Sequence, residues 1–244
     1  MYGVNEVTLL GRVVNKPTSI HRKSADGLAF QVDLTYGMTN MIIWCFAMGG
    51  SGDRAESFGI KAGDYVVFQG HIFAPDRMLR MDVEEPKWLL ALCGRVCATM
   101  KTVEFKGDRN SFHLASVLLT GMVVPGVCTR TSSKGYDFFK FTLHHECQII
   151  LKQKPFYAQQ SIGCYTQVNN ETRKAVVPGA ILLCRGNLDH GNHPIPYVQC
   201  TQVQSLGNVQ NDIIKRYTDK PMKFPKGDTI VTARVYKSLL RDAS

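Results

Sequence analysis

The N-terminal run Val7-Thr8-Leu9-Leu10-Gly11-Arg12-Val13-Val14 is mostly apolar and is interrupted by one glycine. A second run of the same kind, Val117-Leu118-Leu119-Thr120-Gly121-Met122-Val123-Val124, follows 110 residues later. This density of β-branched residues and leucine predicts a strand. Because a glycine inside a strand often marks a bulge or a sharp bend, both runs are expected to form curled strands.

Two further pairs of segments repeat in the same order. Residues 29–34 match residues 138–143 at an offset of 109, and residues 62–72 match residues 178–188 at an offset of 116. Three matches at nearly constant spacing indicate two copies of one module. We therefore divide the 244 residues into a first module 1–95, a connector 96–114, a second module 115–206 and a basic C-terminal extension 207–244.

Each module is predicted to be all-β. Phe30, Val32 and Leu34 alternate with polar residues, and Phe139, Phe141 and Leu143 do the same, which is the period of a half-buried strand. The aromatic residues of these two series, together with Phe68, are expected in the core.

The segment between the third and fourth strands differs between the modules. Residues 51–58 are expected to make one or two helical turns, whereas the longer and more polar counterpart 156–174 is expected to be an extended loop. Five strands with a short helix between the third and the fourth are the pattern of the OB-fold. The predicted architecture is two tandem OB-fold barrels, five-stranded and of Greek-key topology, with Gly11, Gly70, Gly121 and Gly186 at corresponding bends.

The first module also carries the residues of a known family. The run from Asn5 to Val13 is followed by Lys16-Pro17 and later by Lys61-Ala62-Gly63-Asp64-Tyr65-Val66-Val67-Phe68-Gln69-Gly70. Together these resemble the bacterial and mitochondrial single-stranded-DNA-binding proteins over about residues 4 to 75. In the second module only the strand and glycine skeleton of that family remains. The resemblance implies a replication-type OB-fold protein that binds single strands without catalysis.

The charge is concentrated in the second half of the chain. Lys and Arg number 29 against 20 Asp and Glu, a formal net charge of +9 that suits a polyanionic partner. The first module is neutral overall, whereas the second module and the C-terminal extension each carry +4. Because electrostatics dominates non-specific affinity for nucleic acid, residues 115–244 are expected to carry most of the affinity and salt dependence.

Single-strand binding needs aromatic rings for the bases and cations for the phosphates. In the first module the residues of these types are Arg12, Lys16, Arg22, Lys23, Trp44, Phe46, Phe73, Arg77, Arg80 and Trp88. In the second module and the extension they are Arg130, Lys134, Tyr136, Lys140, Lys152, Lys154, Phe156, Tyr157, Arg173, Lys174, Arg185, Lys215 and Arg216.

Three alternatives stay open among these residues. Trp44 and Phe46 share one face of a strand, but the sequence does not show whether that face is exposed or buried. The segment 152–157 interleaves cations with aromatics, or it is simply a strand end that enters a loop. Residues 229–236 could belong to a basic arm that orders on a partner, or to a strand added to a sheet edge.

Several other classes of protein are excluded or disfavoured. The chain contains no phosphate-binding loop, no nucleophile elbow and no His-Glu-x-x-His motif, so we do not expect an enzyme. The eight cysteines are spread through strand-like runs, which favours buried thiols in a reducing intracellular compartment, with neither a metal nor a cofactor. No apolar run of about 18 residues and no secretory signal is visible, so no membrane association is expected.

The leading hypothesis is therefore non-catalytic binding of single-stranded DNA or RNA in OB-fold grooves. Stacking does not distinguish the two sugars, so the choice between DNA and RNA stays open. The alternative is a structural subunit whose OB-folds mediate protein–protein contacts within a larger replication or ribonucleoprotein complex, with the first module and the extension as contact surfaces.

Overall fold

The computed structural model describes residues 3–20, 26–34, 41–73, 91–101, 113–151, 154–189, 197–209 and 234–236. At residues 20, 73, 146–151, 154–160 and 234–236 the description is confined to the backbone. The first half forms β1 (Asn5–Val13), β2 (Thr18–Ile20), β3 (Gly27–Asp33), β4 (Ile42–Met48), α1 (Gly50–Ser57), β5 (Tyr65–Phe73) and β6 (Ala91–Met100). The second half forms β7 (Leu114–Val123), β8 (Cys128–Thr131), β9 (Asp137–Leu151), β10 (Lys154–Gln167), α2 (Asn170–Ala175), β11 (Ala180–Asp189), β12 (Tyr197–Asn208) and β13 (Arg234–Tyr236).

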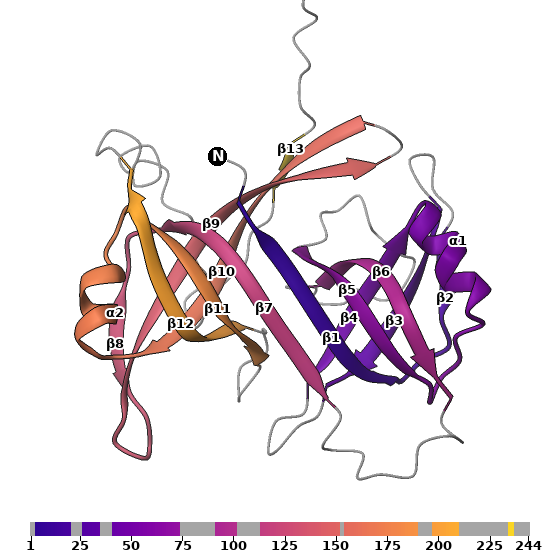
Figure 1. Ribbon diagram of the computed structural model, residues 1–244, viewed down its shortest axis with the longest axis horizontal. Coiled ribbons are helices and arrows are strands. Elements are labelled where there is room, and N and C mark those ends of the chain that lie inside the picture. The colour runs from indigo at the N-terminus through magenta and orange to yellow at the C-terminus, as the bar shows by residue number, and fades with distance from the viewer. Residues whose placement is uncertain are drawn as a thin grey trace, which may run out of the picture.

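The strand pairings of the two halves correspond one to one. In the first half β1 pairs with β3 and β5, β3 pairs with β4, β5 pairs with β6, and β4 closes the ring by a parallel pairing with β6. In the second half β7, β9, β10, β11 and β12 repeat these pairings, including the parallel one between β10 and β12. Each set of pairings closes a five-stranded barrel (Figure 1). The predicted all-β class is confirmed.

Gly11 and Gly121 occupy equivalent bends, as the repeat predicted. Pairing of β1 with β3 begins directly after Gly11. Gly11 lies opposite Val66 on β5, whereas Arg12 lies opposite both Tyr65 on β5 and Asp33 on β3. A Cβ on Gly11 would lie 2.5 Å from the Asp33 carbonyl oxygen, and a Cβ on Gly121 would lie 2.8 Å from that of His144. The neighbouring backbone thus occupies the space that any other side chain needs, and glycine lets one strand serve both sides of the barrel.

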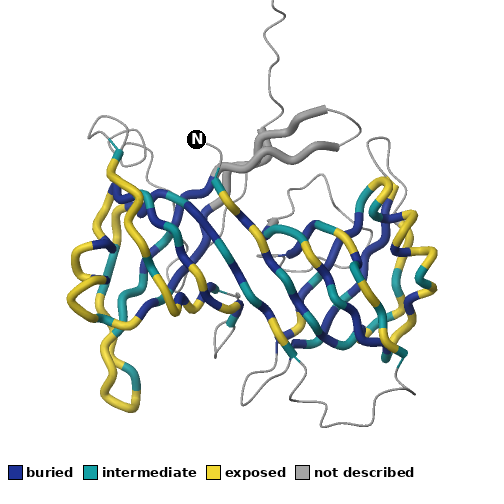
Figure 2. The backbone as a smooth tube through the Cα atoms, viewed as in Figure 1, coloured by how far each residue is buried: buried dark blue, intermediate teal, exposed yellow. Residues whose placement is uncertain are grey.

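The barrel interiors hold the predicted aromatic core. Phe30 and Phe68 are buried and pack edge to face, with ring centroids 6.0 Å apart and planes at 77°. In the second barrel Phe141 is buried, and Phe139 is half-buried and packs against the core. Figure 2 shows how buried and more exposed residues alternate along β1 and β7. The alternation read from the sequence is therefore the alternation between core and surface.

The two barrels are joined by strand pairing. β1 pairs antiparallel with β7, from Asn5 opposite Leu119 to Leu10 opposite Leu114, so both barrels belong to one continuous sheet (Figure 1). Strands β6 and β12 extend to Met100 and Asn208, a few residues past the boundaries expected at 95 and 206. Separating the halves would expose the unpaired edges of β1 and β7, so tests of function require the whole chain.

The expected helix at 51–58 is confirmed as α1, but the prediction of an extended loop over 156–174 was wrong. β10 pairs with β9 along its entire length, so residues 156–167 of this segment belong to a strand. Helix α2 follows directly. The Asn169 side chain accepts hydrogen bonds from the backbone N–H groups of Glu171 and Thr172, and Thr172 Oγ1 accepts one from Asn169 N. This Asn-x-x-Thr capping box is a helix signal that the prediction overlooked.

The C-terminal extension contributes a strand. β13 pairs antiparallel with the N-terminal part of β10, with Tyr236 opposite Tyr157 (Figure 1). Of the two alternatives for residues 229–236, the described part therefore corresponds to a strand added to a sheet edge, within this same chain.

A pair of histidines lies near the junction of the barrels. His71 on β5 is close enough to His145 on β9 for their charges to interact, and His145 Nδ1 lies 2.6 Å from the Thr120 carbonyl oxygen. Burial lowers the pKa of His71 to about 4 from an ordinary 6.5, and the charge of His145 lowers it in the same direction.

This shift predicts a pH-dependent stability. Because the folded-state pKa lies below the unfolded one, the unfolded chain binds the proton first as the pH falls. The free energy of unfolding should be at its full value above about pH 6.5 and should decrease by about 2 to 3 kcal/mol by pH 4.5. Urea unfolding at pH 7.5 and pH 4.5 measures this difference. The variant His71→Gln should lose most of it, and an unchanged difference in that variant would contradict the assignment to His71.

Candidate nucleic-acid interface

Three aromatic side chains meet on the outward face of the second barrel. Tyr165 on β10 lies with its ring centroid 4.5 Å from that of Tyr197 on β12, at an interplanar angle of 54°. Its centroid lies 5.7 Å from that of Phe138 on β9, at 61°. All three side chains are half-buried. We call Phe138, Tyr165 and Tyr197 the aromatic platform.

The alternation of strand side chains places the platform outside the barrel. Cys164 beside Tyr165, Val198 beside Tyr197, and Phe141 three positions after Phe138 are buried in the core. Successive side chains on a strand point to opposite faces, so the platform residues must point outward. The register agrees, since Lys140, Tyr165 and Gln199 lie side by side on β9, β10 and β12.

Cations lie beside these rings. Lys140 Nζ is 5.8 Å from the Tyr165 ring centroid, within the range of a cation–π contact. Lys134 and Tyr136 lie in the turn between β8 and β9, and both are exposed, Tyr136 to 62%. The turn is closed by paired hydrogen bonds between Ser132 and Tyr136, in which Tyr136 N donates to Ser132 Oγ at 3.0 Å and Ser132 N donates to Tyr136 O at 2.8 Å.

A groove of about 880 Å³ runs along this face. The aromatic platform, Lys134 and Tyr136 form one part of its lining. The remainder carries the carboxylates of Asp137 on β9 and Glu171 on α2, together with amide and hydroxyl groups, most of them from β10, from β12 and from the start of α2. The groove, which we call the aromatic groove, therefore combines flat rings, charged groups of both signs and groups able to donate and accept hydrogen bonds.

The equivalent face of the first barrel is more apolar. Gln31 lies opposite Trp44 on β3 and β4, as Lys140 lies opposite Tyr165 on β9 and β10. Trp44 is half-buried, and its ring stacks on Phe46 at 6.1 Å and 20°. Phe46 is only 1% exposed and packs with Ala29 and Ala91. Phe46 was therefore wrongly assigned as a stacking residue, because its ring is already enclosed by apolar neighbours.

The other predicted residues with described side chains lie elsewhere on the surface. Arg12 on β1 is half-buried, and the exposed cations are Lys16 after β1, Arg130 on β8, and Arg173 and Lys174 on α2. None of these five lines the aromatic groove. Among the predicted binding residues whose side chains the structure describes, only Lys134 and Tyr136 line the aromatic groove. Lys140 is connected to it through its contact with the Tyr165 ring.

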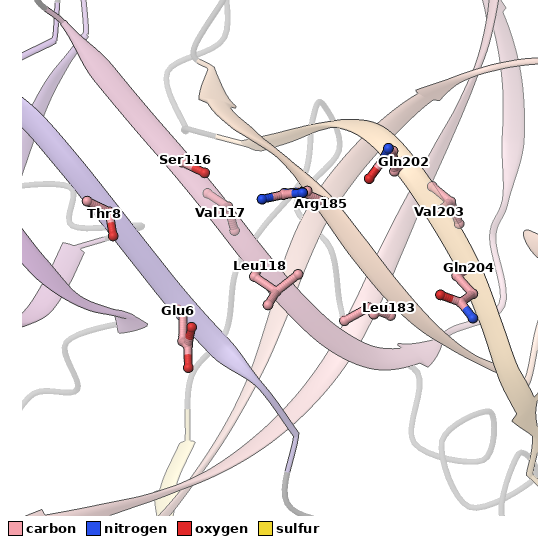
Figure 3. Close-up of a pocket in the computed structure, with 10 residues that line it drawn as sticks. All are labelled: Glu6, Thr8, Ser116, Val117, Leu118, Leu183, Arg185, Gln202, Val203 and Gln204. Carbon is pink, nitrogen blue, oxygen red and sulfur yellow. The ribbon is translucent and has the colours of Figure 1, made fainter.

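Arg185 lines a second groove. This groove, of about 670 Å³, crosses the joined strands β1, β7, β11 and β12 (Figure 3). Arg185 extends from β11 toward Ser116 on β7, and Glu6 and Thr8 line the same groove from β1 (Figure 3). Arg185 therefore shares its surroundings with a carboxylate rather than with the aromatic platform.

Several predicted residues lie outside the described part of the chain, and their assignment stays a prediction. These residues are Arg22, Lys23, Arg77, Arg80, Trp88, Lys152, Lys215 and Arg216. At Phe73, Lys154, Phe156 and Tyr157 the backbone belongs to β5 and β10, but the side chains are not described.

All three platform residues were absent from the predicted binding residues. A signal for one of them was present: Phe138 and Lys140 alternate with the core residues Phe139 and Phe141, so they had to face outward. No comparable signal in the local sequence marks Tyr165 or Tyr197 as part of a binding surface. Their neighbours in the groove come from other strands, so the grouping is visible only in the folded chain.

Among the residues that the structure describes, no group of three or more histidines, cysteines or acidic residues is placed to hold a metal ion. The described cysteines are free thiols, and burial raises the pKa of the Cys45 thiol well above its ordinary value. No helix in the described ranges is long and apolar enough to cross a membrane.

Comparison with solved structures agrees with the two-barrel arrangement. The wild-type single-stranded DNA binding protein from Thermus aquaticus superposes with a TM-score of 0.58 at 12% sequence identity, covering 86% of this chain and 96% of that one. A deletion mutant of the same protein gives a TM-score of 0.58 at 13% identity, over 86% of this chain and 98% of that one. The two proteins share a fold. No protein-family model and no curated protein sequence matches the chain.

Proposed function

We propose that this protein binds single-stranded nucleic acid in the aromatic groove of its second barrel. The observation that carries the proposal is the aromatic platform itself, with Lys140 against Tyr165 on the outward face of β9, β10 and β12. The second and third strands and the adjacent loops of an OB-fold form its usual surface for oligonucleotides. β9 and β10 hold those places in the second barrel.

The chemistry of the groove suits an unpaired strand. Stacking of a base on an aromatic side chain contributes about 1 to 3 kcal/mol, and it requires a base whose face is not covered by a partner strand. Lys140 places positive charge next to the Tyr165 ring and Lys134 lines the same groove, so the two lysines can face the phosphates of such a strand. Asp137 and Glu171 also line the groove, and a bound strand must keep its phosphates on the lysine side. The net charge of +9 and the fold shared with a DNA-binding protein support the same conclusion.

The first barrel has a different role in this proposal. Its equivalent face offers the half-buried Trp44, but the Phe46 ring beside it is buried. The first module is also neutral overall. We propose that it contributes the strand pairing through β1 and a subsidiary contact, either with the strand or with a protein partner.

The test is a fluorescence titration of the whole chain with labelled single-stranded and duplex DNA at several salt concentrations. Single strands should bind more tightly than duplex. The double variant Lys134→Gln/Lys140→Gln should bind more weakly and should reduce the slope of log affinity against log salt by about 1.4, because each phosphate that is no longer neutralised lowers the slope by about 0.7.

Lys61→Gln serves as the matched control, because Lys61 is an exposed lysine that precedes β5 in the first barrel. Its salt slope should stay within error of wild type. Because the control removes one positive charge and the double variant removes two, a reduction half as large in the control would mean that overall charge, rather than the aromatic groove, determines affinity. Absence of binding at low salt would favour the structural-subunit alternative.

A further inference from the structure

The aromatic groove contains amide side chains at defined positions around Tyr165. Gln199 on β12 is the direct register partner of Tyr165, on the side opposite Lys140. Gln167 lies two residues beyond Tyr165 along β10, on the same face of that strand. Both glutamines are exposed and both line the groove.

This arrangement brings an amide within reach of the edge of a stacked base. Neighbouring strands are about 4.8 Å apart, which is less than the width of a purine. A base that lies on the Tyr165 ring therefore extends over β12, where the Gln199 side chain stands. Lys140 on the opposite side already contacts the Tyr165 ring, and its charge suits a phosphate rather than a neutral base edge.

We propose that the groove prefers adenine at the position stacked on Tyr165, and that the side-chain amide of Gln199 reads its edge. This edge is the one that carries N6 and N7: there adenine presents a donor beside an acceptor, which complements the glutamine amide, whereas guanine presents two acceptors. A pyrimidine lacks the second ring and would not extend as far over β12, so its own donor and acceptor would lie farther from Gln199. Stacking alone tolerates every base, so a preference at one position requires such a contact with a base edge. This inference rests on the proposed function and adds selectivity to it.

The experiment moves a single adenine through an oligo-dT of fixed length and measures affinity at each position, which avoids the self-stacking of long adenine runs. One position should bind at least about fivefold more tightly than the all-thymine strand. In Gln199→Leu that gain, measured as the ratio of the two affinities within the same variant, should fall to about one. Threonine is favoured in strands, so Gln199→Thr should keep the fold and should also lose the adenine gain.

Gln204→Leu is the matched control, since Gln204 is an exposed glutamine on the same strand that lines the second groove instead. It should keep the adenine gain. If every adenine position binds like thymine while the all-thymine strand still binds, the inference is wrong and the proposed function stands. A gain that persists in both Gln199 variants would overturn the assignment to Gln199, and failure to bind any strand would overturn both proposals.

Discussion

Tyr165→Leu is expected to weaken binding of single-stranded DNA by about 10- to 100-fold. The tyrosine ring is central to the aromatic platform, since it contacts the rings of Phe138 and Tyr197 and the ammonium group of Lys140. Leucine preserves the apolar bulk on the strand but removes the flat π-face on which a base stacks. The free energy of stacking one base accounts for the range. Titration with oligo-dT at constant salt measures the change.

Trp44→Leu is the matched control, because Trp44 occupies the equivalent register position in the first barrel. We expect it to change affinity by less than about threefold. Thermal unfolding of both variants verifies that the barrels persist. If Trp44→Leu lost more affinity than Tyr165→Leu, the first barrel would be the principal binding site and our division of roles between the barrels would be reversed.

The second large effect concerns stability. Gly186→Val is expected to lower the free energy of unfolding by about 4 kcal/mol, enough to prevent accumulation of folded protein. A Cβ at this position would collide with the carbonyl oxygen of Gln199, and it would also lie 2.8 Å from the Cα of Cys200. Both atoms belong to the backbone of β12, which pairs with β11 at this point. Because backbone cannot move aside as a flexible side chain can, the strands must separate.

The control is Gly50→Ala at the start of α1, where a Cβ would meet no atom within 4 Å. It should leave stability unchanged or raise it slightly, since alanine favours helix over glycine. Urea unfolding compares the two variants. A midpoint for Gly186→Val equal to that of wild type would show that the tight approach of β11 to β12 does not constrain the barrel.

For Gly186 the local sequence predicted a bend, and the close approach of the β12 backbone was shown only by the structure. Gly70 on β5 holds the equivalent position in the first barrel, where a Cβ would collide with the carbonyl oxygen of Cys93. These glycines interrupt strong strand patterns, and such an interruption marks a bulge, a tight bend or the close approach of another backbone. The same local reasoning identified Phe30 and Phe141 as core residues, because one face of each strand is apolar and the other is polar.

The binding face was less predictable, because the relevant strands are apolar on both faces or lie far apart in the sequence. Trp44 and Phe46 share a face, yet one is half-buried and the other is enclosed. Their exposure depends on packing by other segments, which strand periodicity does not reveal. The helix signal at Asn169 was local but was overlooked beside the polar residues of β10.

The amino-acid sequence alone was sufficient for the repeat, the strand alternation and the bends at Gly11 and Gly121, since each of these is visible in short runs of neighbouring residues. The aromatic platform was decided only by the tertiary structure. Phe138, Tyr165 and Tyr197 come from three strands, and they meet because β10 pairs with both β9 and β12. The parallel pairing of β10 with β12 closes the barrel between strands that are distant in the chain. Its register, set by packing of the whole core, places Gln199 rather than another residue of β12 beside Tyr165.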